Sequence, residues 1–196
     1  MLKLRGDGGK RRAGTDHDEV DLVTKVAGQD RRAFETLYRL YHPRLTAFLT
    51  RFLRRPDRVE EALNDTLMVV WNRADRYNGE SKVSTWVFGI AYRQGLKALN
   101  RFDEAVEDPD AENRRSHDKT PEEQLDAHQT RLVLDRAMQH LSADHRAVVD
   151  LAYFHEMGYR EIAEIMDCPV DTVKTRMFHA RRNLKAQLSG QLADWL

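Results

Sequence analysis

The stretch between residues 159 and 184 restricts the fold more than any other part of the sequence. It reads YREIAEIMDCPVDTVKTRMFHARRNL. Its apolar residues fall on a helical face in two separate runs, Ile162, Ala163, Ile165 and Met166, then Val173, Met177, Ala180 and Leu184. Pro169 separates the runs, because it lacks an amide proton and disfavours helical geometry at Cys168. The pattern predicts two short helices joined by a tight turn.

The second of these helices is basic. Between Thr172 and Lys185 there are five Lys or Arg residues and no acidic residue. A basic amphipathic helix held across a turn by a shorter one is the arrangement of a helix-turn-helix that reads the major groove of DNA. The alternative is an ordinary helical hairpin with a solvated basic face. The concentration of charge favours DNA binding.

Charge is also segregated along the rest of the chain, although the formal net charge is zero. Residues 22–101 hold 15 basic and 8 acidic residues, a net of +7, whereas residues 102–126 hold 3 and 10, a net of −7. These blocks indicate two modules joined by a linker. We expect a disordered extension over residues 1–17, a first module over 18–101, a flexible acidic linker over 102–119 and a second module over 120–190.

Helical periodicity fills the first module, and no strand alternation occurs in the chain. A short helix is expected from Asp16 to Ala27. A long helix capped by Asp30 follows, with a kink or break at Pro43. We expect the next helix over Arg58–Arg73, with Asp57 as its N-cap.

A further helix of the first module begins at Ser84 or Thr85. In the second module, Thr120 and Ser142 are predicted N-caps of two helices that precede the helix-turn-helix. The predicted fold class is therefore all-α, with two small helical domains and a flexible acidic linker between them.

Several other classes of protein are disfavoured. The single cysteine, Cys168, excludes an internal disulfide and a CxxC metal site, and it fits a reducing cytosol. We expect Cys168 to pack in the turn between the two helices, with a redox switch as the alternative. The histidines lack metal-ligand spacing, and no apolar run reaches the length of a membrane span. We expect no metal, no cofactor and no catalytic residue, because no nucleophile–base set is apparent.

Four segments, taken in order, resemble the extracytoplasmic-function (ECF) group of the sigma-70 family of bacterial RNA polymerase sigma factors. They are AFETLYRLYHPRLTAFL, VEEALNDTLMVVW, YNGESKVSTWVFGIAYR and LSADHRAVVDLAYFHEMGYREIAEIMDCPVDTVKTRMFHARRNLK. The first three are similar to the sigma-2 domain and the last to the sigma-4 domain. The resemblance implies a polymerase subunit that directs promoter-specific initiation, with sigma-2 reading the −10 element and sigma-4 the −35 element.

In the sigma-4 domain, the resemblance implies that the base edges are contacted by Lys174, Thr175, Phe178 and His179. It implies phosphate contacts for Arg176, Arg181, Arg182 and Lys185, and such contacts position a helix without specifying sequence. Two residues depart from the family pattern. His179 replaces a more usual Arg, and Asp171 replaces a Gly at the start of the helix, where an acid favours the helix dipole but repels phosphate.

In the sigma-2 domain, the resemblance implies a pocket for an extruded −10 base and cations that grip the DNA backbone. The pocket candidates are Tyr77, Asn78, Gly79, Ser81, Lys82 and Ser84, and the cations are Arg93, Lys97 and Arg101. The helical register of Trp86 favours the core, with a DNA-melting aromatic as the alternative. Arg93 replaces the usual Asn, and Gly89 stands where a basic residue is common.

The implied polymerase-binding face consists of Glu60, Glu61, Asn64, Asp65 and Met68, which would meet the clamp helices of the largest subunit. A solvated face is the alternative for Glu60 and Glu61. The expected partners are core RNA polymerase (clamp helices and flap), promoter DNA and an anti-sigma factor that is often membrane-tethered, with no small-molecule substrate. We therefore expect a cytoplasmic protein, held at the membrane where its anti-sigma factor is anchored there. The main alternative is a helix-turn-helix regulator that is not a polymerase subunit, which has no reason to carry residues 59–101.

Overall fold

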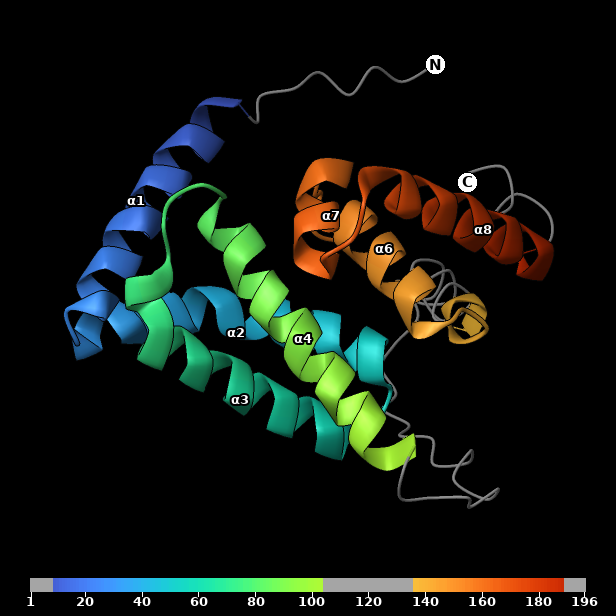
Figure 1. The fold of residues 1–196 in the computed structure, drawn as a ribbon, viewed down its shortest axis with the longest axis horizontal. Helices are drawn as coiled ribbons and strands as arrows, with labels where there is room; N and C mark the ends of the chain where they lie inside the picture. The colour runs from blue at the N-terminus through green and yellow to red at the C-terminus, as the bar shows by residue number, and fades with distance from the viewer. Residues whose placement is uncertain (1–8, 104–135, 189–196) are drawn as a thin grey trace, which may run out of the picture.

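The protein was analysed as a computed structural model that describes residues 9–103 and 136–188. Every regular element within these ranges is a helix (Figure 1). The N-terminal module, residues 9–103, contains α1 (Gly9–Ala27), α2 (Arg31–Leu53), α3 (Pro56–Arg73), the 3-10 turn η1 (Ala74–Arg76) and α4 (Val83–Asp103). The C-terminal module, residues 136–188, contains α6 (Ala143–Tyr153), α7 (Tyr159–Met166) and α8 (Val170–Gln187). The all-α prediction is confirmed.

Two of the predicted helix caps are present. The Asp30 carboxylate accepts hydrogen bonds from the backbone N–H groups of Arg32 and Ala33 at 2.8 and 3.2 Å. The Ser142 hydroxyl accepts one from the N–H of His145 at 3.3 Å. Both side chains satisfy donors that the first helical turn leaves without partners. The predicted cap Thr120 lies outside the described residues.

Other boundaries differ from the predictions. The long helix α2 continues through Pro43 without a break. Pro43 lies on the exposed side of α2, so water can reach the carbonyl that loses its helical partner. The helix α3 begins at Pro56, which suits the first helical position, and Asp57 lies in the first turn and pairs with Arg55 at 3.0 Å. Asp57 is therefore not the N-cap.

The helices α1 and α4 also begin earlier than predicted. The first residue of α4 is Val83, so Ser84 and Thr85 lie inside its first turn rather than at the cap. The first residue of α1 is Gly9. The helix therefore includes residues 9–17 of the N-terminal extension, for which disorder over residues 1–17 stays a prediction.

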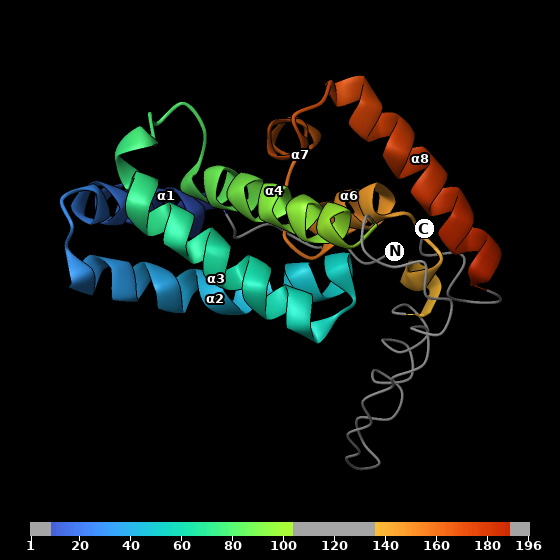
Figure 2. The same cartoon turned by 60° about the horizontal axis from the view of Figure 1, so that its bottom comes forward.

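The central helix of the N-terminal module is α2, which contacts α1, α3 and α4 (Figure 1). Its buried residues recur every three or four positions and include Leu37, Tyr41, Leu45, Phe48 and Phe52, all at most 1% exposed. Figure 2 shows α3 and α4 lying over α2. The apolar core continues into the C-terminal module, because α6 packs on α2 and α7 packs on α4.

The predicted helix-turn-helix is confirmed as α7, a turn over Asp167–Pro169, and α8. Asp167 adopts a left-handed conformation (φ 49°) and ends α7, with its N–H directed at the carbonyl of Ala163. The two helices bury the faces expected from the sequence, and Ile162, Ile165, Val173 and Met177 are all at most 2% exposed. This packing holds the basic side of α8 outward.

Two glycines of α4 provide a matched test of the packing. A Cβ at Gly95 would lie 2.6 and 2.7 Å from ring carbons of the buried Phe52, whereas a Cβ at Gly89 would meet only ordinary contacts of 3.5 Å or more. We expect Gly95→Ala to lower the free energy of unfolding by about 1–3 kcal/mol through overpacking. Gly89→Ala should be neutral or stabilising by up to about 1 kcal/mol. Urea unfolding of both variants measures this; equal effects would contradict the packing described.

Candidate nucleic-acid and polymerase interfaces

The outward side of α8 presents most of the predicted −35 residues to solvent. Lys174, Thr175, Phe178, Arg181 and Arg182 are exposed, and Phe178 is 63% exposed. The opposite side, formed by Val173, Met177, Ala180 and Leu184, is at most 2% exposed. An exposed aromatic ring among cations has no structural role in the core, so this side of α8 is available for a ligand.

The start of α8 carries a local ion pair. Lys174 Nζ lies 2.9 Å from Asp171 Oδ1, and its hydrogen bond holds the pKa of that carboxyl below its usual value. Both groups are exposed, so the pair contributes little to stability. The pair does, however, link Lys174, which is predicted to face the bases, to Asp171, which departs from the family pattern.

Two of the arginines on α8 are held by residues that sequence reasoning did not single out. Arg176 lies 2.5 Å from the Asp144 carboxylate and also donates to Cys168 Sγ at 3.6 Å. Arg181 donates to the Tyr153 hydroxyl, with Nε at 2.9 Å. These partners come from α6 and from the turn before α8, and no local sequence signal connects them to α8. Arg176 and His179 are only partly exposed.

The loop before α4 brings the predicted −10 pocket residues together. The Tyr77 hydroxyl donates to the Ser81 carbonyl at 2.6 Å, which closes the loop over four residues. Asn78 Oδ1 accepts from the N–H of Glu80 at 3.1 Å, and Gly79 adopts the left-handed conformation (φ +75°) at the turn. The Tyr77 ring lies 5.6 Å from that of Trp86. Trp86 is half-buried, so it is less enclosed than its helical register predicts.

Two of the −10 pocket candidates, Lys82 and Ser84, lie at the start of α4 and differ in solvent exposure. Ser84 is half-buried in the first turn of α4. Lys82 is exposed and lies 2.9 Å from Glu161 of α7, in the other module.

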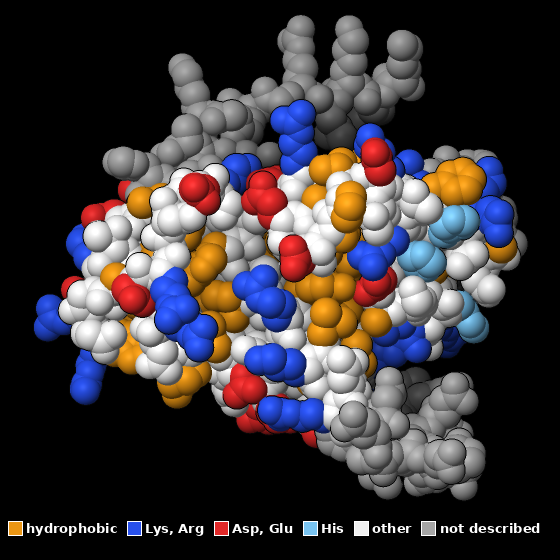
Figure 3. Space-filling model, in the orientation of Figure 1, with side chains coloured by type: hydrophobic (Ala, Val, Ile, Leu, Met, Phe, Trp, Pro, Cys, Tyr) orange, Lys and Arg blue, Asp and Glu red, His pale blue; other side chains and the backbone are white. Residues whose placement is uncertain are grey.

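The predicted backbone-gripping cations follow one exposed strip of α4. Arg93, Lys97 and Arg101 are exposed. Figure 3 shows Lys and Arg side chains along the course of α4 and others around α8. Arg101 also lies 2.6 Å from Glu61 of α3, which links this strip to the candidate polymerase-binding face.

The candidate polymerase-binding face of α3 is exposed. Glu60, Glu61, Asn64, Asp65 and Met68 point away from the core, and Met68 is 58% exposed. The opposite side of α3 buries Val59, Ala62, Leu63, Thr66 and Leu67. Trp71 is half-buried with its ring 5.0 Å from that of Phe34, which places it against the core.

Within residues 9–103 and 136–188, no group of three or more His, Cys, Asp or Glu side chains is arranged to hold a metal ion. In the same ranges, no helix is both long and apolar enough to cross a membrane. Cys168 is a free, half-buried thiol packed against the core at the turn, as predicted.

Comparisons with known proteins match both modules. The model of Sigma-70 region 2 matches residues 37–106, and that of Sigma-70, region 4, matches residues 131–184. The ECF RNA polymerase sigma-E factor of Haemophilus influenzae is 30% identical over 181 residues, which are 85% of this chain and 93% of that protein. The chain belongs to the ECF sigma factors of the sigma-70 family. The region 2 match removes the alternative of a regulator that is not a polymerase subunit.

Two solved structures share the fold of this sigma factor. One is the sigma factor RpoE of Bartonella quintana in complex with the anti-sigma factor NepR, with a TM-score of 0.64 and 27% identity over 79% of this chain and 95% of that one. The other is CnrH in complex with the cytosolic domain of CnrY, with a TM-score of 0.64, covering 86% of this chain and 95% of that one. At 21% identity, the second shows the fold alone.

The acid at the start of α8 yields a prediction about DNA affinity. Asp171→Asn removes a charge that repels phosphate and releases Lys174. We expect the sigma factor to bind −35 duplex DNA roughly 3–10-fold more tightly, since each retained cation–phosphate contact adds to affinity. Fluorescence anisotropy at fixed salt measures this. Glu164→Gln, an exposed acid on α7, is the control for a general change in charge.

The histidine pair between α6 and α8 predicts a pH dependence of stability. The rings of His145 and His179 are 6.3 Å apart, and burial, followed by His179, lowers the pKa of His145. The folded state therefore binds fewer protons there than the unfolded state, and stability falls as pH drops through the ordinary histidine range near 6.5. Urea unfolding at pH 7.5 and 5.5 should show a smaller loss for His145→Gln than for the wild type. An equal loss in both proteins would refute this role of His145.

Proposed function

We propose that this sigma factor binds core RNA polymerase through the outer face of α3, captures the −10 element with the loop before α4 and with α4 itself, and holds the −35 element with α8. The observation that carries the proposal is the division of α8 into one fully buried side and one exposed side bearing Lys174, Thr175 and Phe178. A Lys side chain can donate to guanine, Thr is versatile, and Phe can contact a thymine methyl group. Arg176, Arg181 and Arg182 would grip the phosphates on either side.

The −10 assignment is supported by the loop that precedes α4. Its turn at Asn78 and Gly79 is closed by the Tyr77–Ser81 hydrogen bond, which gives a rigid rim next to an exposed Lys82. Arg93, Lys97 and Arg101 follow at four-residue spacing on one strip of α4, so they can track a strand of DNA. An extruded base would enter beside Tyr77 and Ser84.

The polymerase assignment is supported by the composition of the α3 face. One exposed Met surrounded by Glu60, Glu61, Asn64 and Asp65 matches a small apolar contact with a polar rim. The flap of polymerase would hold the C-terminal module. Because the solved RpoE structure is a complex with the anti-sigma factor NepR, we further propose that an anti-sigma factor, cytosolic or membrane-tethered, controls this protein in the cytoplasm.

Transcription in vitro tests the proposed function. Purified core polymerase loaded with this chain should make promoter-specific RNA from a library of genomic fragments, and sequencing the transcripts should reveal shared −10 and −35 elements. Core polymerase alone provides the baseline. If the loaded polymerase yields no promoter-specific RNA above that baseline, the proposal is wrong.

Two substitutions in α8 test the assignment of surfaces. Lys174→Ala and Phe178→Ala should each weaken −35-dependent initiation by roughly 5–150-fold, the effect of losing about 1–3 kcal/mol of base contact. Binding to core polymerase should be unchanged. Asn183→Ala, an exposed neutral change on the same helix, is the control. Loss of polymerase binding in the Lys174 or Phe178 variant would show that the surfaces are misassigned.

A further inference from the structure

An exposed tyrosine at the end of α6 lies beside α8. Tyr153 is the last residue of α6 and is 46% exposed, so its ring contributes little to the core. Arg181 of α8 donates to its hydroxyl from both Nε, at 2.9 Å, and Nη2. The guanidinium carbon lies 5.6 Å from the centre of the Tyr153 ring. Because α6 and α8 pack on each other, this pair belongs to the C-terminal module (Figure 1).

The two bonds from Arg181 leave the hydroxyl proton of Tyr153 available. A guanidinium group has only donors, so the hydroxyl oxygen accepts both bonds through its lone pairs. The hydroxyl proton must then be donated to a different acceptor. Within residues 9–103 and 136–188, no carbonyl or side chain accepts it. In the free protein this proton is open to water, and therefore to a ligand with a strong acceptor.

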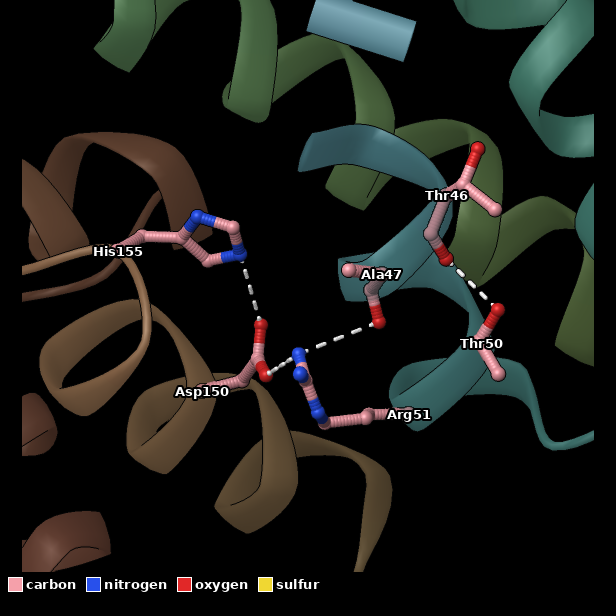
Figure 4. Close-up of polar contacts among 6 residues, drawn as sticks. All are labelled: Thr46, Ala47, Thr50, Arg51, Asp150 and His155. Atoms are coloured by element: carbon pink, nitrogen blue, oxygen red, sulfur yellow. Dashed lines mark hydrogen bonds and ion pairs between the residues drawn. The ribbon is translucent and has the colours of Figure 1, made fainter. Parts of the chain in front are cut away.

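Arg181 is held by a different kind of partner from that of the buried Arg51. Arg51 lies 2.6 Å from the carboxylate of Asp150, which cancels its charge (Figure 4). Tyr153 instead holds Arg181 through a neutral hydroxyl. Among the described residues, no acidic side chain pairs with Arg181. The guanidinium is therefore fixed in direction while its positive charge stays uncompensated.

The helical register places Arg181 at one edge of the exposed side of α8. It follows the buried Met177 by four residues and the exposed Phe178 by three, so it lies between the buried side and the base-facing candidates. Lys185 lies about one turn further along the same edge. A helix in the major groove has a sugar–phosphate backbone beside each of its edges. Arg181 and Lys185 are thus placed to follow one backbone.

The opposite edge of α8 is electrostatically weaker. Arg176 lies on that edge, and its guanidinium is 2.5 Å from the carboxylate of Asp144 in α6. Both side chains are partly exposed, so the carboxylate compensates part of the charge that a phosphate would otherwise meet. The cation that is both oriented and uncompensated is Arg181. The stronger phosphate contact is therefore expected on the Arg181 edge.

We propose that Tyr153 and Arg181 form a site for a single DNA phosphate, here called the phosphate site, in which the Tyr153 hydroxyl donates to a phosphate oxygen and orients the guanidinium that pairs with the same phosphate. This inference rests on the proposed function, because it takes α8 to lie in the groove of the −35 element. Hydrogen bonds to an ionised phosphate are stronger than those between neutral groups. Such a contact positions α8 without reading sequence, so Tyr153 helps to set where Lys174 and Phe178 meet the bases.

Fluorescence anisotropy of the full chain on a −35 duplex tests the phosphate site with three substitutions. The duplex carries the element shared by the transcripts of the in vitro experiment. Tyr153→Phe keeps the ring and removes the hydroxyl, so affinity should fall roughly 2–12-fold, the effect of one lost hydrogen bond. Arg181→Gln also removes the charge and should weaken binding further. Tyr153→Glu still accepts from Arg181 but cancels its charge, so it should weaken binding more than Tyr153→Phe.

The salt dependence of binding separates the charge from the hydroxyl. Arg181→Gln and Tyr153→Glu should each reduce the steepness of log K against log salt by about 0.9, since one phosphate contact no longer releases a counterion. Tyr153→Phe should leave the slope unchanged, because it changes no charge. Tyr38→Phe, the same change at an exposed tyrosine of α2, should alter neither affinity nor slope. A duplex of arbitrary sequence should give the same order of slopes, because phosphate contacts do not depend on sequence.

Single neutral methylphosphonate linkages, placed in turn along each strand of the −35 duplex, locate the phosphate. One linkage should weaken binding of the wild type, and the same linkage should have less effect on both Tyr153→Phe and Arg181→Gln. A purely structural role of Tyr153 would not couple it to one linkage. If no linkage is coupled to both variants, the two residues do not share a phosphate and the proposal is wrong.

Circular dichroism and binding to core polymerase show whether each variant is folded and keeps its other surfaces. Arg181→Gln supplies the test if Tyr153→Phe does not fold. The phosphate site is refuted if Tyr153→Phe binds the duplex as tightly as the wild type, or if the variants lose only polymerase binding. The two proposals fail separately. A wild type that makes no promoter-specific RNA contradicts the proposed function, whereas unchanged DNA binding by variants of a chain that supports transcription contradicts only the phosphate site.

Discussion

The packing of aromatic rings along one face of α2 underlies the rest of the structure. Phe48 and Phe52 are stacked with centroids 5.6 Å apart, and they contact Phe88 and Tyr92 of α4 at 5.5 and 5.4 Å. These rings fix how α4 crosses α2, and through His155 they also support the C-terminal module. The close fit of Gly95 against Phe52 shows how little room this arrangement leaves. Every candidate surface is thus positioned by a rigid, dry cluster remote from solvent.

The distribution of charge over the surface of this sigma factor is more informative than its net charge. The net charge of the whole chain is zero, yet α8 and α4 present cations while α3 presents acids on its outer face. Where charge enters the interior, it is paired or hydrogen-bonded, as for Arg51 with Asp150 and for Arg146 with backbone carbonyls. Burial lowers the pKa of Arg146 to about 10, which leaves it charged at neutral pH. A protein can therefore carry a positively charged surface for DNA and a negatively charged surface for a protein partner while its net charge indicates neither surface.

The sequence predicted the elements well and their junctions less well. The caps at Asp30 and Ser142 and the two helices around Pro169 follow from local chemistry, and the structure contains all of them. The start of α3 was misplaced because Pro56 competes with Asp57 for the helix start. Of the kink or break predicted at Pro43, a break does not occur, because that residue faces solvent. The contacts of Lys82 with Glu161 and of Arg176 with Asp144 join residues far apart in the sequence, so no periodicity could indicate them.

The unbroken core that runs from α2 through His155 to α6 also bears on how the protein folds. Each module is small, and a small domain buries too little surface to be very stable alone. While the modules share Phe48, Phe88 and the Arg51–Asp150 pair, they should unfold as one cooperative unit. Once parted, they become two weaker units whose apolar faces are newly wet. The chain is thus most resistant to unfolding and proteolysis in the form in which the two modules are packed together.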